Sequence, residues 1–447
     1  MYALIDGNNF YVSCERVFDP GLRGKPVVVL SNNDGCVISR SDEARQLGVR
    51  MGQPWFECRP WVARDGLIGL SANFALYGDM SDRLMNLLGR FAPRQDVYSI
   101  DECFLDLEGL DIDRLTWGRD LRSTVLRWLG LPCCVGIGPT LTQAKLANQI
   151  AKRAERGPFG PTDADLARVC DLSALTEERR TGLLATLGVG EVWGVGRKLQ
   201  PRLEADGLHT ALDLARADAQ RLSRRYSVSL ERTVLELQGQ RCIDLSTDPV
   251  PRQQILVSRS FGQPVRQTSD LLCAIATFTA QAAEKLRRQH SLAACLSVFI
   301  QPRIQPLKRH VSGSWSRGQT TRTTVLLLRP TADTGVLLQA AREGLGRIAQ
   351  PETAYVRGGV QLLQLTPQQP PAQQAELELD APPSDEVRQR RMSLMLALDQ
   401  MNQRFGRGSL RWALTGLEAD RQAWSGRRAQ VSPGYTTRWS DLAEARV

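Results

Sequence analysis

Two adjacent carboxylates lie in an otherwise mostly apolar stretch, VYSIDECFLDL at residues 97–107. The apolar residues of this stretch predict strand structure. Successive side chains of a regular strand point to opposite faces, so Asp101 and Glu102 would diverge. For both acids to serve one site, the backbone at Ser99–Glu102 has to bend, as at a hairpin turn or a β-bulge. We predict such a bend, with Asp101 approaching Asp6 most closely and Glu102 reaching in from the side.

A further acid ends a short predicted strand at the N-terminus, because MYALID stops at Asp6 and is followed by a Gly-Asn-Asn loop. Only three histidines occur, and none lies close to another. The ten cysteines are scattered without a CxxC pair, which is typical of reduced thiols in a cytosolic protein. Any metal would therefore be held by carboxylates, which suits Mg²⁺. From spacing alone, an alternative stays open: Asp6 is a loop acid, and Asp101 with Glu102 marks an exposed strand end.

The net charge of the chain is +9, which suggests an anionic partner, nucleic acid first. A codon preference for arginine in a GC-rich genome would explain the same charge. No run of about 18 uncharged apolar residues occurs, and the early acid Asp6 does not fit a signal peptide. The sequence predicts a cytoplasmic protein without a membrane partner.

Hydrophobic periodicity predicts several regions along the 447 residues. Strands alternate with helices in residues 1–165, with helices at 79–91, 118–129 and 141–154, which indicates an α/β sheet domain. Residues 166–242 are helical and include a pair of helices around a glycine turn at 192–208. Residues 250–365 have the order β-α-β-β-α-β, which is ferredoxin-like, with Ser269 as the expected N-cap of the first helix. A linker rich in Pro and Gln (366–385) precedes a helix and a basic tail (386–447).

Six motifs then carry a resemblance to a known family. They are IDGNNFYVSCE (5–15), VVVLSNNDGCVISRSDEARQLGVRMG (27–52), VYSIDECFLDL (97–107), VGIGPTLTQAKLANQIAK (135–152), VWGVGR (192–197) and SRSFG (258–262). With these motifs in family order, the chain resembles the Y-family translesion DNA polymerases, and more narrowly the UmuC-like catalytic subunits of bacterial DNA polymerase V. The tail SPGYTTRWSDL also looks like that subfamily, so the resemblance runs nearly end to end.

The resemblance implies a multidomain α/β and α+β fold shaped like a right hand. Its parts would be a palm with a ferredoxin-like sheet and small fingers (1–165, fingers about 20–75), a helical thumb with a helix-hairpin-helix (166–242), a ferredoxin-like little finger (250–365), the linker, and a C-terminal UmuC-type region (386–447).

The resemblance also assigns the acids. Asp6 and Asp101 match the metal-bridging aspartates of the family, Glu102 the third metal ligand, and the carbonyl of Gly7 a backbone ligand. Such a site would hold two Mg²⁺ ions and catalyse attack of a primer 3′-hydroxyl on the α-phosphate of a dNTP. The implied function is error-prone synthesis opposite damaged template in the SOS response.

Tyr11 matches the steric-gate position, where a large ring beneath the sugar leaves no room for a 2′-hydroxyl. The residues alone leave open that Phe10 and Tyr11 both pack in the core. Ser39, Arg45 and Lys152 fall at positions that hold the incoming triphosphate.

Lys145 lies seven residues before Lys152 and shares its helix face, and its role stays open. Asp42 stands where several relatives carry a tyrosine near Arg45, and it would repel a triphosphate unless it turns away or pairs with Arg45.

Contacts with DNA and with partner proteins are also implied. The turn at Gly194 and Gly196 would bind a DNA phosphate, and Arg259, with Arg266, would contact the duplex backbone. Gln374, Leu377 and Leu379 fit the QxxLxL shape of peptides that dock on a sliding clamp. The other implied partners are a processed UmuD-type dimer and a RecA filament.

Two other functions are alternatives to polymerase activity. A catalytically silent DNA-binding adaptor would not need the acids, yet Asp6, Asp101, Glu102 and Tyr11 are all present. Another palm-type phosphoryl transferase, such as a nucleotide cyclase, would explain the acids. It would not explain the hairpin motif at 192–197, the order of elements at 250–365, or the basic charge.

Overall fold

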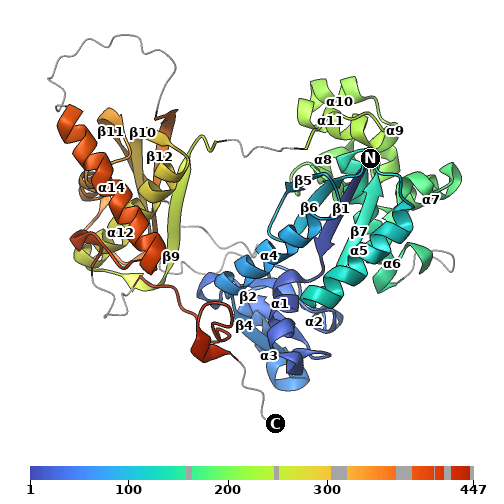
Figure 1. Ribbon diagram of the computed structural model, residues 1–447, viewed down its shortest axis with the longest axis horizontal. Helices are drawn as coiled ribbons and strands as arrows, with labels where there is room; N and C mark the ends of the chain where they lie inside the picture. Colours follow the sequence, from blue (N-terminus) through green and yellow to red (C-terminus); the bar gives the residue numbers. More distant parts are fainter. Residues whose placement is uncertain are drawn as a thin grey trace. The chain divides into compact units, whose positions relative to one another are not determined.

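The computed structural model describes residues 1–157, 164–245, 251–303, 320–368, 385–406, 408–416 and 424–442. The chain divides into two compact units (Figure 1). The first unit consists of Met1–Ser31, Gly35–Pro249 and Gln430–Val447, and the second of Asn32–Asp34 with Val250–Ala429. In the part of the chain that the structure describes, no helix combines the length and the apolar character needed to cross a membrane.

A five-stranded sheet forms the centre of the first unit, with the strand order β5-β6-β1-β7-β8. Its strands are β1 (Tyr2–Gly7), β5 (Arg94–Val97), β6 (Glu102–Asp106), β7 (Cys133–Gly138) and β8 (Val169–Asp171). β1 is buried along its whole length and pairs antiparallel with both β6 and β7. The register places Asp6 opposite Glu102.

The expected bend in the 97–107 stretch is a hairpin turn. β5 ends at Val97 and β6 begins at Glu102, and the amides of Tyr98 and Ser99 both donate to the carbonyl of Glu102 at 3.1 Å. The stretch is therefore two strands joined by a tight turn. Asp101 lies in the turn and Glu102 starts the second strand, so strand alternation does not separate the two acids.

Helices α1 (Phe10–Phe18), α4 (Phe74–Leu88), α5 (Arg114–Leu129) and α6 (Leu141–Arg156) pack on this sheet (Figure 1). α6 approaches β7 so closely at Gly136 that a Cβ atom there would overlap the backbone of Ala144 and Asn148. This glycine therefore fixes the height of α6 above the sheet.

A second, three-stranded sheet lies in the region expected to form the fingers. It has the order β3-β2-β4, with β2 (Val27–Leu30) antiparallel to β3 (Val37–Arg40) and parallel to β4 (Ile68–Ser71). The short helices α2 (Asp42–Gln46) and α3 (Trp55–Asp65) complete it. β4 is an edge strand, and Ser71 at its end forms a parallel bridge with Val431 near the C-terminus.

Five short helices follow in the region expected to form the thumb: α7 (Glu177–Thr186), α8 (Gln200–Ala205), α9 (Ala211–Arg216), α10 (Ala219–Arg225) and α11 (Val228–Leu237). The expected helix pair at 192–208 is only half right. α8 is the second helix, but residues 192–199 form no helix, and a single 3₁₀ turn at Val189–Glu191 precedes the expected range. The positive φ of Gly194 redirects the chain between them.

Glu236 ties α11 to the sheet domain, because its buried carboxylate accepts hydrogen bonds from the amides of Thr142, Cys242 and Ile243 at 2.9–3.1 Å. Thr142 lies in the first turn of α6. The last thumb helix is thus fixed to the helix that carries the two candidate lysines.

The second unit confirms the expected order β-α-β-β-α-β. Its elements are β9 (Ile255–Val265), α12 (Thr268–Arg288), β10 (Ser291–Pro302), β11 (Thr321–Thr331), α13 (Thr334–Ile348) and β12 (Tyr355–Pro367). The sheet order is β11-β10-β12-β9, and each neighbouring pair is antiparallel. The expected N-cap was wrong: Gln267 precedes α12, and Ser269 is already inside its first turn.

The C-terminal region is divided between the units. Helix α14 (Asp385–Phe405) belongs to the second unit, where Asp399 accepts two hydrogen bonds from Arg287 at 2.6 and 2.7 Å. From Gln430 onward the chain belongs to the first unit. Residues of the region expected at 386–447 thus contribute to both units.

Candidate active site

Three acids gather at one end of the central strands. Asp6 is at the end of β1, and the next amide, that of Gly7, donates to the carbonyl of Asp101 at 2.9 Å. The Ser99 hydroxyl donates to Oδ1 of Asp101 at 2.7 Å, which orients that carboxylate within the hairpin turn. Glu102 stands opposite Asp6 in the register. The antiparallel pairing and the turn together bring the three acids to one place. The closest approach of Asp101 to Asp6 stays a prediction.

Burial dominates the electrostatics of Asp6. It raises the pKa of Asp6 to about 7 against the attraction of Lys152, and the carboxylates of Glu102 and Asp101 add to the rise. Any cation that approaches a carboxylate in such an environment stabilises its ionised form.

Two lysines of α6 neutralise the acids. Nζ of Lys152 lies 2.5 Å from Oδ2 of Asp6, and Nζ of Lys145 lies 3.1 Å from Oε2 of Glu102. Lys145 also lies over the ring of Tyr98, 4.1 Å from its centre. Lys145, whose role the sequence left open, thus belongs to the site, and its seven-residue spacing from Lys152 was the signal that indicated it.

The donor set fits a hard divalent cation such as Mg²⁺, because it consists of carboxylates and a backbone carbonyl without histidine. The nearest thiol in the register is that of Cys134, opposite Asp6, and burial raises its pKa to about 12, so it stays protonated at neutral pH. Within the described residues, no three His, Cys, Asp or Glu side chains are grouped so as to hold an ion together. In this arrangement Asp6 and Glu102 pair with the two lysines, and Asp101 accepts from the Ser99 hydroxyl.

Tyr11 lies in the first turn of α1, and its ring is only partly buried. It stacks on Tyr77 with ring centres 4.5 Å apart and planes inclined by 20°. Burial and, secondarily, the Asp101 carboxylate raise the pKa of Tyr11. Phe10, in contrast, is 3% exposed and belongs to the core. The two neighbouring rings are therefore not equivalent, and Tyr11 lies beside the acids.

The expected triphosphate residues lie on the finger elements and on α6. Asp42 pairs with Arg45, at 3.1 Å, and with Arg156, at 3.5 Å, which is the arrangement that removes its repulsion of a triphosphate. Nε of Arg45 is buried and has no hydrogen-bond partner among the described residues. Ser39 is buried, and its Oγ accepts from the amide of Val12 at 3.4 Å.

The expected DNA contacts lie outside this cluster. Gly194, with φ of 90°, and Gly196 are in the turn before α8, next to Trp193, whose indole nitrogen donates to the Tyr98 hydroxyl at 3.1 Å. Arg259 is exposed on β9 of the second unit, and Arg266 is exposed just after it. The clamp-motif residues Gln374, Leu377 and Leu379 lie outside the described residues.

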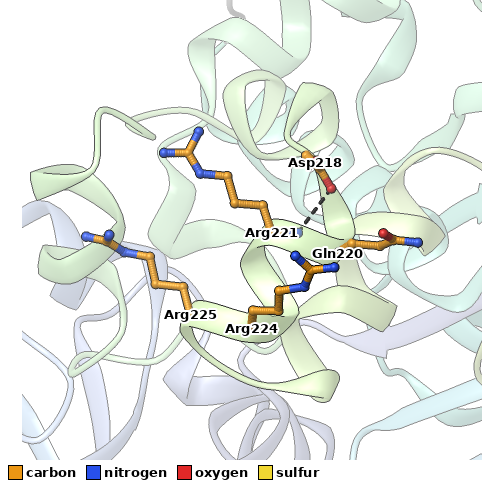
Figure 2. A pocket seen from close by; sticks show the side chains of 5 residues that line it. All are labelled: Asp218, Gln220, Arg221, Arg224 and Arg225. Carbon is orange, nitrogen blue, oxygen red and sulfur yellow. Dashed lines mark hydrogen bonds between the residues drawn. The ribbon is translucent and has the colours of Figure 1, made fainter.

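A basic hollow of about 370 Å³ lies over α10. Figure 2 shows its lining residues: Asp218, Gln220, Arg221, Arg224 and Arg225. The guanidinium groups diverge, Arg225 pairs with Asp206, and Asp218 caps α10 by accepting from the amide of Arg221. The hollow is a cationic surface and lacks the converging groups of a catalytic site.

Models of known protein families match three parts of the chain. Residues 5–149 match the model of the impB/mucB/samB family, residues 252–377 match the C-terminal domain of that family, and residues 392–445 match a domain of unknown function, DUF4113. Protein UmuC of Salmonella typhimurium is 40% identical over 99% of both chains, and protein SamB of Salmonella typhimurium is 40% identical over the whole of both.

More distant relatives share the fold. DNA polymerase IV 1 of Bacillus subtilis is 29% identical over 66% of this chain and 69% of its own. Among solved structures, a Y-family DNA polymerase chimera of Dbh and Dpo4 superimposes with a TM-score of 0.59 and 19% identity, over 82% of this chain and 99% of the chimera. The chain belongs to the impB/mucB/samB family, and its fold is that of a Y-family DNA polymerase.

Proposed function

We propose that this chain is the catalytic subunit of an error-prone translesion DNA polymerase that extends a primer opposite damaged template during the SOS response. The relatives named UmuC and DNA polymerase IV support DNA-directed DNA polymerase activity. The observation that carries the proposal is the gathering of Asp6, Asp101 and Glu102 at the end of β1 and its neighbouring hairpin.

The polymerase fold implies dependence on a divalent metal. We assign the ligands to the carboxylates of Asp6, Asp101 and Glu102 and to the carbonyl of Gly7, and the metal to two Mg²⁺ ions. When bound, such ions lower the pKa of the primer hydroxyl and stabilise the charge of the leaving pyrophosphate. The chain itself supplies the fixed carboxylates and, through the Ser99 hydroxyl, the orientation of Asp101.

The substrate nucleotide would be held from two sides. Tyr11 lies beneath the sugar and excludes a 2′-hydroxyl. Ser39, Arg45 and Lys152 contact the triphosphate, and the Asp42–Arg45 ion pair supports the role of Arg45 because it neutralises the one acid on that helix turn that would repel the ligand. Lys152 neutralises Asp6 and so also lies beside the phosphoryl-transfer site.

Primer-template DNA would be held by its phosphates, at the amides of Gly194 and Gly196 in the thumb and at Arg259 in the little finger. The partners proposed are a processed UmuD-type dimer, a RecA filament and the sliding clamp, the last through Gln374, Leu377 and Leu379. The proposed location is the cytoplasm, at the nucleoid.

A silent DNA-binding adaptor of a mutagenesis complex is the second candidate. Such an adaptor would need the basic surfaces but not the three acids. One of these acids, Asp6, is buried, and burial raises its pKa. Retaining such a group is typical of a catalytic site.

Primer extension on an undamaged template and on one with an abasic site tests the proposal. The wild-type chain should extend in Mg²⁺, and Asp101→Ala should reduce extension by at least about a thousandfold, because a metal ligand is lost. Asp111→Ala, at an exposed acid, is the matched control and should extend like wild type. Equal extension by wild type and Asp101→Ala would contradict the proposed mechanism.

A further inference from the structure

The returning tail, defined as residues 430–435, is built into the first unit. The Ser71 amide donates to the carbonyl of Gln430 at 2.9 Å, and the Gln430 amide donates to Oγ of Ser71 at 3.0 Å. Val431 then pairs with Ser71 in a parallel bridge at the open edge of β4. These bonds add a short strand segment to the finger sheet.

Ser432 is the residue of the returning tail that enters a hydrogen-bond network. Its hydroxyl donates to Oε1 of Glu15 at 3.1 Å and accepts from Nδ2 of Asn73 at 3.0 Å. Glu15 is 1% exposed, so its carboxylate depends on protein donors. Asn73 is the N-cap of α4 and accepts from the amide of Leu76.

The same oxygen of Glu15 accepts a second hydrogen bond, from the hydroxyl of Tyr77 at 2.6 Å. Tyr77 is fully buried on α4, and its ring is the surface on which Tyr11 stacks, at 4.5 Å between centres. Tyr11 and Glu15 lie one turn apart on α1. A continuous path of contacts thus joins Ser432 through Glu15 and Tyr77 to Tyr11.

A second contact holds the returning tail against the far end of α1. The ring of Tyr435 stacks on Phe18 at 4.9 Å, with planes inclined by 11°. The tail between Ser432 and Tyr435 lies over a hollow of about 440 Å³, which Glu15 and Leu70 help to line. The hydroxyl of Ser432 is therefore the contact by which the tail acts on Glu15.

We propose that Ser432 is a positioning residue for sugar selection, which holds Glu15 so that Tyr77 keeps the ring of Tyr11 in place beneath the sugar. The inference rests on the proposed role of Tyr11 as the steric gate. It makes the C-terminal tail part of the nucleotide-selecting apparatus.

The physical reason is the sensitivity of a steric gate to small displacements. Discrimination against one hydroxyl depends on a clash that a shift of a few tenths of an ångström relieves. Glu15 has two hydroxyl donors on one oxygen, and the loss of either frees the carboxylate to rotate. The hydroxyl of Tyr77 then loses its fixed partner, and the stacked ring of Tyr11 loses its fixed support.

The test compares full-length chains carrying Ser432→Ala, Tyr77→Phe or both with wild type. The measured quantity is the ratio of kcat/KM for a dNTP to that for the rNTP of the same base. Each single variant should lower this ratio about three- to tenfold, as expected for the loss of one hydrogen bond of ordinary net strength. The double variant should lower it no more than the larger single effect, since both hydroxyls act through Glu15. Ser440→Ala, at an exposed hydroxyl beyond the returning tail, should leave the ratio unchanged.

Tyr11→Ala, measured alongside, separates the two hypotheses. If Tyr11→Ala lowers the ratio strongly while Ser432→Ala and Tyr77→Phe keep the wild-type value, the gate stands and the role of the tail is overturned. If Tyr11→Ala also keeps the wild-type ratio, the gate is wrong and the inference falls with it. Hydrogen exchange at the Ser71 amide, which donates to Gln430, reports docking of the returning tail independently of activity. If this amide exchanges in wild type as fast as an amide without a hydrogen bond, the inference is overturned.

Discussion

The ammonium nitrogen of Lys152 lies 2.5 Å from Oδ2 of Asp6, so a side chain expected at the triphosphate is in contact with one expected at the metal. Lys145 stands in the same relationship to Glu102, at 3.1 Å. Two of the three acids are therefore neutralised from within the chain. A divalent cation that enters the site has to compete with these ammonium groups.

Replacing Lys152 with Met should separate metal binding from nucleotide binding. The substitution removes the competing ammonium, so Mn²⁺ should bind the nucleotide-free protein more tightly, by up to about tenfold, while the KM for dNTP should rise about tenfold. Calorimetric Mn²⁺ titration and steady-state primer extension measure the two effects. Lys25→Met, at an exposed lysine of the finger region, is the control. A weaker Mn²⁺ affinity in Lys152→Met would contradict the competition.

The stability of the metal-free protein should depend on the protonation of Asp6. Its pKa is raised from 3.8 to about 7, so the folded state holds this proton more tightly than the unfolded chain does. The resulting contribution to stability is fully present below pH 3.8 and is lost as pH rises through 7.

Asp6→Asn removes that dependence. In EDTA, the free energy of unfolding of Asp6→Asn relative to that of wild type should increase as pH rises from 5 to 8. The expected increase is about 1 kcal/mol or more. Urea unfolding at each pH measures it. Asp111→Asn, at an exposed acid, should follow the wild-type profile. Parallel profiles for Asp6→Asn and wild type would show that Asp6 is not held with a raised pKa.

Ribonucleotide incorporation should rise when the ring of Tyr11 is removed. Tyr11→Ala opens the space beneath the sugar and should increase incorporation of rNTP relative to dNTP by about tenfold or more, because a steric clash is lost. Tyr11→Phe keeps the ring and its stacking on Tyr77 and should keep most of the selectivity. Unchanged selectivity in Tyr11→Ala would remove this residue from the gate.

The contact of Gly136 with α6 should be intolerant of a methyl group. Gly136→Ala would place a Cβ into the backbone of Ala144 and Asn148, and it should lower the free energy of unfolding by about 2–4 kcal/mol and reduce primer extension, because α6 carries both lysines.

Gly182→Ala in α7 is the matched control. Among the described residues, no heavy atom outside the adjoining backbone of α7 lies within 4 Å of the added Cβ, so the free energy of unfolding should rise by about 0.5–1 kcal/mol. Urea unfolding measures both variants. Equal stability of the two would contradict the close approach of α6 to β7.

Much of the fold could be predicted from hydrophobic periodicity. The errors are at helix starts, because the apolar repeat begins several residues after the helix does. The helix expected at 79–91 begins at Phe74, and the one expected at 118–129 begins at Arg114. Both start at a capping side chain: Asn73 accepts from the amide of Leu76, and Asp113 from that of Thr116. Such caps precede the apolar repeat, so an argument from apolar spacing places the helix start too late.

Strand alternation predicted a bend between the adjacent carboxylates Asp101 and Glu102, and the hairpin turn confirms that bend. The assignment of these acids to a metal site came from the family resemblance and stays a prediction. The network of Glu15, Tyr77 and Ser432, in contrast, could not be predicted from the sequence. Its members are 62 and 417 residues apart, and each is an unremarkable residue of its own segment. Only tertiary structure brings them together. Likewise, no composition change marks residue 430, where the C-terminal region passes from one unit to the other.

The bridge between Ser71 and Val431 also bears on how the chain is made. The hydrogen bond between Gln430 and Ser71 spans 359 residues, so at about 5–20 residues per second the ribosome releases β4 roughly 20–70 s before its partner exists. During that interval the edge of β4 exposes backbone groups that can pair with another nascent chain. The finger sheet is therefore completed only after Val431 has been synthesised, and a chain that stops before this residue is left with an open, aggregation-prone edge at β4.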